Sequence, residues 1–223
     1  MSLYSLKDFL NYQRARYSGK ITCPLRPCFE SKACTDYFES RLSEATTYLE
    51  YGSGGSTVLA AGLGKRVYSV DSDRIFIMRV REALNKYAPD KVSNVSLLYA
   101  NIGFTREWGQ PVFRTPTSVR LARWREYSEK PWDSLKQVGH VPDLVLIDGR
   151  FRVACALRSM QHLVNKPNAI LIVDDYIGRD WYLEIERFGE MVEVVGRMAV
   201  FRPKVMDMEE IEQSIQRYVA DWR

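Results

Sequence analysis

The sequence predicts an α/β fold: a doubly wound, mostly parallel sheet of seven strands, closed by a C-terminal antiparallel hairpin. Helical and strand-like patterns alternate along the chain. Apolar runs at residues 144–147 and 170–173 show no polar alternation, which indicates strands buried on both faces of a parallel sheet. Residues 191–195 and 198–201 are separated by Gly196-Arg197, which is a hairpin signal.

Each element follows from its local pattern. An N-terminal helix around Phe9 and Tyr12 gives way to a loop with Pro24 and Pro27. Before the hairpin, strands are expected at residues 46–50, 66–70, 94–99, 143–147 and 169–173, and helices at 33–42, 74–87 and 152–164. We expect a helical extension at 1–33, a main domain at 34–203 with a long lid-like connection at about 104–140, and a C-terminal helix at 204–223.

Length and composition limit the classes of protein. A chain of 223 residues, 46% hydrophobic and 27% charged, suits one ordinary globular domain with a sizeable core. The net charge of +4 is too small to imply a nucleic-acid or membrane partner. No apolar run is long enough to cross a bilayer, and the start has no signal-peptide profile, so we expect a cytoplasmic protein. Cys23, Cys28 and Cys34 lack the paired spacing of a zinc site and are expected to be free thiols.

A glycine-rich turn at residues 50–57 lies between an apolar strand and an amphipathic helix. Its glycines, Gly52, Gly54 and Gly55, can adopt positive φ and let a ligand approach the backbone. Asp71 follows about 20 residues later, at the tip of the second strand, where an acid can bind a pair of ribose hydroxyls. The pattern predicts a nucleoside-containing cofactor; the alternative is a turn that only joins a strand to a helix.

The surroundings of the turn decide between cofactors. Thr57 stands where a dinucleotide fingerprint has its third glycine, and Glu50 would repel a pyrophosphate at the helix N-terminus. A ligand with an ammonium and a sulfonium group would be attracted. The turn resembles motif I of the class I S-adenosylmethionine-dependent methyltransferases. The resemblance implies a Rossmann-like fold and a cofactor site at Glu50, Gly52, Ser53, Gly54, Asp71, Asn101, Ile102 and Asp148.

Three carboxylates follow the next two strands. Asp148 ends the fourth strand, and Asp174 and Asp175 end the fifth, so all three should converge beside the cofactor's methyl group. Such a cluster needs a compensating cation. It is similar to the metal site of the cation-dependent, catechol-type O-methyltransferases, which implies Mg²⁺ or another divalent ion on these three side chains and catalytic roles for Asp148 and Asp174. That family's Asn is Asp175 here, and its lysine base is Phe151.

An alternative interpretation needs no metal. Asp148 can cap the following helix, and the strand-end carboxylates can pair with Arg150, Arg152 or Arg179. Arginines at the crevice would also suit an anionic acceptor.

The segment between the third and fourth strands is rich in aromatic residues. Trp124, Tyr127 and Trp132 are interleaved with arginines, and they form either a lid or an amphipathic helix that buries its aromatic side chains. We expect the acceptor to contact Arg150, Arg152, Tyr176 and Trp124.

The function predicted is a methyltransferase that methylates an oxygen of a small anionic or aromatic acceptor, not a nucleic acid. The motifs at residues 147–152 and 173–176 look like those of bacterial methyltransferase-like proteins. Two alternatives stay open. One is a catalytically idle S-adenosylmethionine-binding protein. The other is a nicotinamide-dependent oxidoreductase, against which Glu50, Thr57 and the terminal hairpin all count. The sequence does not determine the oligomeric state.

Overall fold

The sheet has the predicted architecture. The computed structural model describes residues 6–223, so residues 1–5 of the expected N-terminal extension lie outside the described part. Within it, seven strands form one sheet in the order β3-β2-β1-β4-β5-β7-β6. Neighbouring strands are parallel except where β7 meets β5 and β6. The strands are β1 (Thr47–Tyr51), β2 (Arg66–Asp71), β3 (Val95–Tyr99), β4 (Leu144–Ile147), β5 (Ile170–Val173), β6 (Gly189–Val195) and β7 (Met198–Pro203). The mostly parallel sheet with an antiparallel hairpin is thereby confirmed.

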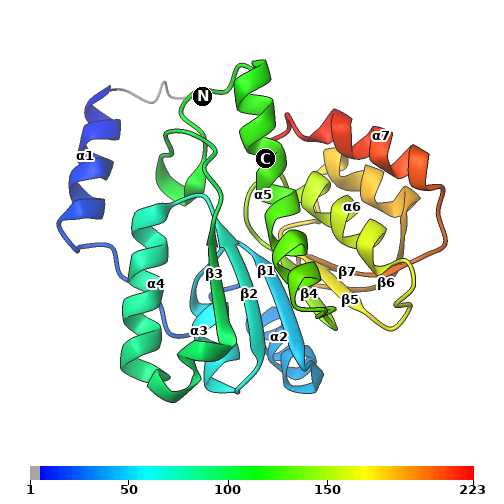
Figure 1. Ribbon diagram of the computed structural model, residues 1–223, viewed down its shortest axis with the longest axis horizontal. Coiled ribbons are helices and arrows are strands. Elements are labelled where there is room, and N and C mark those ends of the chain that lie inside the picture. The colour runs from blue at the N-terminus through cyan, green and yellow to red at the C-terminus, as the bar shows by residue number, and fades with distance from the viewer. Residues whose placement is uncertain (1–5) are drawn as a thin grey trace.

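Helices cover both faces of the sheet (Figure 1). The α-helices are α1 (Leu6–Tyr17), α2 (Lys32–Glu44), α3 (Gly55–Gly62), α4 (Arg74–Tyr87), α5 (Ser118–Gln137), α6 (Arg152–Leu163) and α7 (Met208–Tyr218). Short 3₁₀ helices are η1 (Pro89–Asn94), η2 (Glu107–Gly109) and η3 (Asp180–Arg187). No helix among residues 6–223 is both long and apolar enough to span a bilayer.

Alternate strand residues pack into two separate layers, because neighbouring side chains of a strand point to opposite faces. Tyr48 and Leu146 lie in the core cluster beneath α2, while Leu49 and Val145 lie in the larger cluster beneath α5, α6 and α7. A third cluster joins α3 to α4 through Val58 and other small and branched residues. The central strands β1, β4 and β5 are therefore buried almost throughout, while the edge strands β3 and β6 are partly exposed.

The long connection after β3 is mostly helical. Its aromatic residues Trp124, Tyr127 and Trp132 are buried on one side of α5, a helix of 20 residues. The structure thus has the amphipathic helix that the sequence left as an alternative to a lid. Only residues 100–117 of this connection are irregular, apart from the short turn of η2.

Candidate functional site

The strand order reverses between β1 and β4, and the candidate site lies at this point. After β1 the chain builds outward through β2 and β3, and then returns to place β4 on the other side of β1. In open α/β sheets, ligands bind at the carboxyl ends of the strands where the order reverses. The two loops touch here: a Cβ added to Gly52 would lie 3.0 Å from the backbone nitrogen of Gly149.

The three glycines of the turn differ in backbone conformation and in the space around them. Gly52 has φ +99°, which favours glycine, and it packs against the loop after β4. A Cβ on Gly55 would lie 2.0 Å from the carbonyl oxygen of Arg26, so Gly55 lets the N-terminal segment cross α3. Gly54 has extended backbone, and a Cβ there would meet nothing within 4 Å. Of the three glycines, only Gly52 uses the left-handed region that glycine permits, and only Gly54 has open space beside its Cα atom.

Glu50 lies beneath the turn and is fully buried. Its carboxylate accepts hydrogen bonds from the hydroxyl groups of Tyr48 (2.8 Å) and Ser56 (2.6 Å), and from that of Thr57. Burial raises the pKa of Glu50, and these hydrogen bonds oppose the shift. Glu50 therefore fastens the end of β1 to the first turn of α3, and its place in a cofactor site stays a prediction.

Asp71 ties the tip of β2 to the glycine turn. Its carboxylate accepts hydrogen bonds from the backbone nitrogen atoms of Ser53 (3.1 Å) and Asp73 (2.7 Å). Burial raises the pKa of Asp71 to about 7, and the nearby Asp73 carboxylate adds to this. Ser53 also contacts Ser69 through a hydroxyl–hydroxyl bond of 2.6 Å, so the turn and β2 are held together at two points.

Arg152 joins the loops that follow β4 and β5. Its side chain is nearly fully buried, and it donates to the carbonyl oxygens of Gly149 (3.1 Å), Asp148 (3.2 Å) and Asp174 (2.5 Å). It also forms an ion pair of 2.9 Å with Oδ1 of Asp148. With its donors used in this way, Arg152 is a structural residue and does not face an acceptor as the sequence predicted.

Asp175 points to arginines as well. It has φ +54°, and its carboxylate lies 2.7 Å from Arg179, 3.3 Å from Arg197 and 3.9 Å from Arg152. Residues 6–223 contain no group of three or more His, Cys, Asp or Glu side chains placed to hold one metal ion. The three-carboxylate metal site therefore does not fit this arrangement, and the arginine alternative does, because guanidinium groups occupy the carboxylates of Asp148 and Asp175.

Asp148 and Asp174 form a pair of interacting carboxyl groups just after β4 and β5. Burial, followed by the charge of Asp148, raises the pKa of Asp174 to about 7. Burial also raises the pKa of Asp148, although Arg152 lowers it. Oδ1 of Asp174 is buried without a hydrogen-bond partner in the described structure. A carboxyl group with a pKa near neutrality and a free oxygen can accept and return a proton.

Of the other residues predicted to contact the acceptor, two are buried in the core and one is partly exposed. Trp124 is 1% exposed and donates to the carbonyl oxygen of Ile102 (3.2 Å). Tyr176 is 4% exposed and donates to Glu186 (2.7 Å). Both pack in the core and not at the crevice, because their rings complete hydrophobic layers. Arg150 differs: it is only half-buried, and its Nε has no hydrogen-bond partner in the described structure.

The end of β3 is covered by the irregular connection. Asn101 is exposed, and its side-chain oxygen accepts a bond from the backbone nitrogen of Gly103 (3.0 Å), while Ile102 is buried. Farther along, Gly109 (φ +67°) lies against the tip of β2: a Cβ there would be 2.7 Å from the hydroxyl oxygen of Ser72 and 3.8 Å from Cγ of Arg150. The connection thus bridges the ends of β2 and β4.

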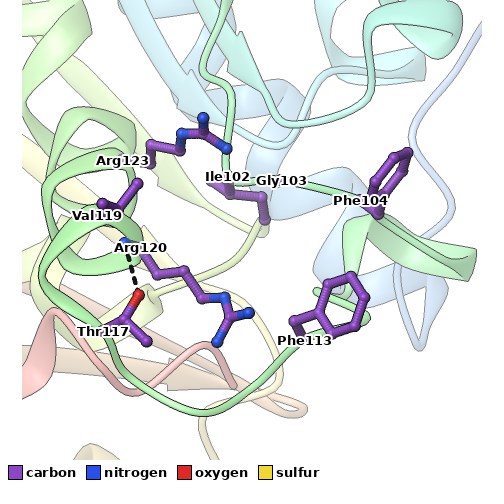
Figure 2. Close-up of a pocket in the computed structure, with 8 residues that line it drawn as sticks. All are labelled: Ile102, Gly103, Phe104, Phe113, Thr117, Val119, Arg120 and Arg123. Atoms are coloured by element: carbon purple, nitrogen blue, oxygen red, sulfur yellow. Dashed lines mark hydrogen bonds between the residues drawn. The ribbon is translucent and has the colours of Figure 1, made fainter.

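Sequence reasoning missed two cavities beside this connection. One, of about 350 Å³, is lined by Phe104, Phe113, Arg120 and Arg123 among others (Figure 2). The signal was available in the periodicity of α5. Arg120 lies one turn before Trp124, and Arg123 lies one turn before Tyr127, so the arginines continue the aromatic side of α5 toward its N-terminus.

Comparisons with known proteins were made for the whole chain. No protein-family model and no curated protein matches it. A solved structure of a methyltransferase-like protein from Silicibacter pomeroyi DSS-3 is 33% identical, with a TM-score of 0.73, over 88% of this chain and 99% of that chain. The cofactor-bound protein Rv0187 from MTB is 16% identical, with a TM-score of 0.50, over 91% of this chain and 92% of that chain, and this second likeness is one of fold alone.

Proposed function

The chain belongs to the class I S-adenosylmethionine-dependent methyltransferase superfamily, and we propose that it transfers a methyl group from S-adenosylmethionine to an oxygen of a small anionic or aromatic acceptor. The observation that carries this proposal is the pairing of Asp71 with the glycine turn. The carboxylate at the tip of β2 lies beside a turn whose Gly54 leaves open space above its backbone.

The residues present fit this cofactor. Asp71 would bind the ribose hydroxyls, the backbone of Gly52 to Gly54 would hold the amino-acid end, and Asn101 with Ile102 would contact the base. The partners of Glu50 are hydroxyl groups and those of Asp71 are backbone amides. Negative charge at this end is therefore not neutralised by arginine, which favours a ligand with ammonium and sulfonium groups over a pyrophosphate.

The proton is handled by the carboxyl pair. When bound, S-adenosylmethionine supplies an activated methyl group. As the acceptor oxygen bonds to the methyl carbon and the sulfur–carbon bond breaks, the acceptor's proton must leave and S-adenosylhomocysteine remains. We assign this proton to the Asp148–Asp174 carboxyl pair, because the pKa of about 7 at Asp174 lets the pair hold a proton near neutral pH. Arg152 holds Asp148 and the backbone of Asp174 in position.

Arg150 is the residue that we assign to the acceptor's anionic group. It follows β4 at the crevice, and burial together with the neighbouring Arg152 lowers its pKa, which shows that its charge is poorly solvated. A carboxylate or phenolate beside it would relieve this cost and form charge-assisted hydrogen bonds. No step is assigned to a metal, since two of the three carboxylates that would bind it, Asp148 and Asp175, are paired with arginines.

The test is a screen of small phenols and carboxylates, with an RNA pool as comparison, read by release of S-adenosylhomocysteine. Against an active acceptor, Asp174→Asn should lower kcat by roughly 10²-fold or more. Arg150→Gln should raise KM, and the exposed-site control Asp90→Asn should change neither. Turnover with RNA alone would overturn the acceptor class. Binding of S-adenosylhomocysteine with no turnover on any acceptor would favour the idle binding protein.

A further inference from the structure

A second cavity lies between the N-terminal helix and the end of β3. It has a volume of about 370 Å³, and its walls come from α1, the β2–α4 turn, the connection after β3, and α5. Three arginines line it, Arg16, Arg74 and Arg123, one from each of three separate elements. In the sheet, two strands separate this end of β3 from β4, which carries Asp148. The cavity is therefore distinct from the carboxyl pair, and it shares one wall residue, Asn101, with the proposed base contact of the cofactor.

The three arginines line the same cavity as one phenol, Tyr99. Tyr99 ends β3, and its hydroxyl experiences the positive charges of Arg74, Arg16 and Arg123. Asp73 is the carboxylate that acts on the same hydroxyl, but it is already engaged: it forms an ion pair of 2.5 Å with Arg16. Two positive charges are thus left in excess around the cavity.

Neither Arg74 nor Arg123 forms an ion pair with a carboxylate anywhere in residues 6–223. Like charges gathered at a concave surface raise the local potential and attract a counter-ion. Planar guanidinium groups bind phosphate through paired, charge-assisted hydrogen bonds. The hydroxyl of Tyr99 supplies a further donor at the floor.

The mouth of the cavity is aromatic. Tyr17 is 70% exposed and Phe104 is 66% exposed, and both line it. Figure 2 shows Phe104 and Arg123 on opposite sides of Ile102 and Gly103, so an arginine and an aromatic ring flank the same stretch of backbone. We propose that this cavity is an anion site for a phosphate group, held by Arg74, Arg123 and the Tyr99 hydroxyl, with room at its mouth for an organic substituent.

The test uses isothermal titration of the full chain with inorganic phosphate, at constant ionic strength maintained with chloride. We expect saturable binding that weakens at least tenfold in the double variant Arg74→Gln/Arg123→Gln. The matched control is Arg66→Gln/Arg81→Gln, which removes the same charge from exposed arginines outside the cavity and should bind like the wild type. Circular dichroism checks that each variant is folded.

A second arm identifies the source of the phosphate. Phenyl phosphate should bind more tightly than inorganic phosphate if the ligand is an organic phosphate whose ring contacts Tyr17 and Phe104. Equal affinities would assign the site to free phosphate. Absence of saturable binding, or equal weakening in both double variants, would overturn the proposal. Titration with S-adenosylhomocysteine is run separately, so a failure of the anion site and a failure of the methyltransferase proposal are distinguishable.

Discussion

The carboxylates at the ends of β1 and β2 have different partners from those that follow β4 and β5. Around β1 and β2, Glu50 and Asp71 are buried against hydroxyl and amide groups. Around β4 and β5, Asp148 and Asp175 are paired with Arg152 and Arg179. Glu50 and Asp71 therefore have no arginine partner, whereas two of the three carboxylates at the ends of β4 and β5 are paired with arginine.

This difference separates what each set of carboxylates can bind. Uncompensated carboxylates favour a cationic ligand that carries no phosphate, while arginine-paired carboxylates have little affinity left for a metal ion. The comparison therefore explains why one class of cofactor fits the glycine turn, and why resemblance to a metal-dependent site at β4 and β5 does not extend to its ion.

The largest loss of stability is expected on replacing Arg152, which joins the loops after β4 and β5. Arg152→Gln leaves the buried carbonyl oxygens of Gly149 and Asp174 without their donor and the Asp148 carboxylate without its charge partner. Each buried carbonyl oxygen that loses its donor costs about 1–3 kcal/mol in the free energy of unfolding, and the partly exposed Asp148 carboxylate adds less because solvent screens it. Urea denaturation measures this, with exposed Arg66→Gln as the control. A loss below about 1 kcal/mol would mean that Arg152 does not join the two loops.

A smaller, pH-dependent change in stability is expected from Asp71, at the end of β2. The pKa of Asp71 is raised to about 7 in the folded state, above its ordinary value of 3.8, so the folded protein binds this proton more tightly than the unfolded chain does. The stabilisation is complete below about pH 4 and is lost as the pH rises through about 7. Relative to Asp71→Asn, the wild type should therefore lose stability as the pH rises from about 4 to about 7. Urea denaturation across this range gives the slope, and an unchanged slope in Asp71→Asn would contradict it.

The smallest effect is expected from metal ions. Since arginines pair with Asp148 and Asp175, Mg²⁺ or Mn²⁺ should leave the melting temperature unchanged, and EDTA should not change it either. Thermal-shift titration is the measurement. A rise in Tm that Asp174→Asn abolishes would restore the metal site that the sequence favoured as one alternative.

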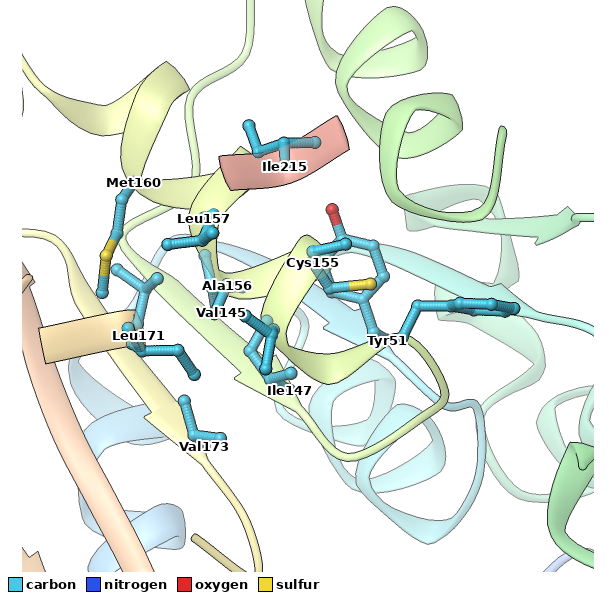
Figure 3. Packing of buried hydrophobic residues seen from close by; sticks show 14 of the residues in the cluster. Tyr51, Val145, Ile147, Cys155, Ala156, Leu157, Met160, Leu171, Val173 and Ile215 are labelled. Atoms are coloured by element: carbon cyan, nitrogen blue, oxygen red, sulfur yellow. The ribbon is translucent and has the colours of Figure 1, made fainter. Parts of the chain in front are cut away.

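The sheet could be predicted because its signals are local. Val145, Ile147, Leu171 and Val173 belong to unbroken apolar runs, and these side chains pack together beneath α6 (Figure 3). Such runs indicate burial on both faces without any knowledge of tertiary contacts. The hairpin followed from a two-residue turn for the same reason.

The site could be predicted only in part, because the partner of each carboxylate depends on residues that are brought together by the fold. Sequence position placed Asp148 and Asp174 at strand ends, but nothing in it distinguished a metal from the guanidinium group of Arg152. The burial of Trp124 depended on which face of α5 packs on the sheet. Arg74 and Arg123 meet across the end of β3 from segments about fifty residues apart, which no spacing rule reveals.

The most direct test of the central claim is calorimetric titration of S-adenosylhomocysteine, with NAD as the competing candidate. Gly54 and Gly62 both have open space for a side chain, so valine at either position should be tolerated by the fold. We predict binding of S-adenosylhomocysteine at roughly micromolar Kd, no binding of NAD, at least tenfold weaker binding in Gly54→Val, and wild-type affinity in Gly62→Val. Binding of NAD without S-adenosylhomocysteine, or equal affinities in the two valine variants, would contradict the account.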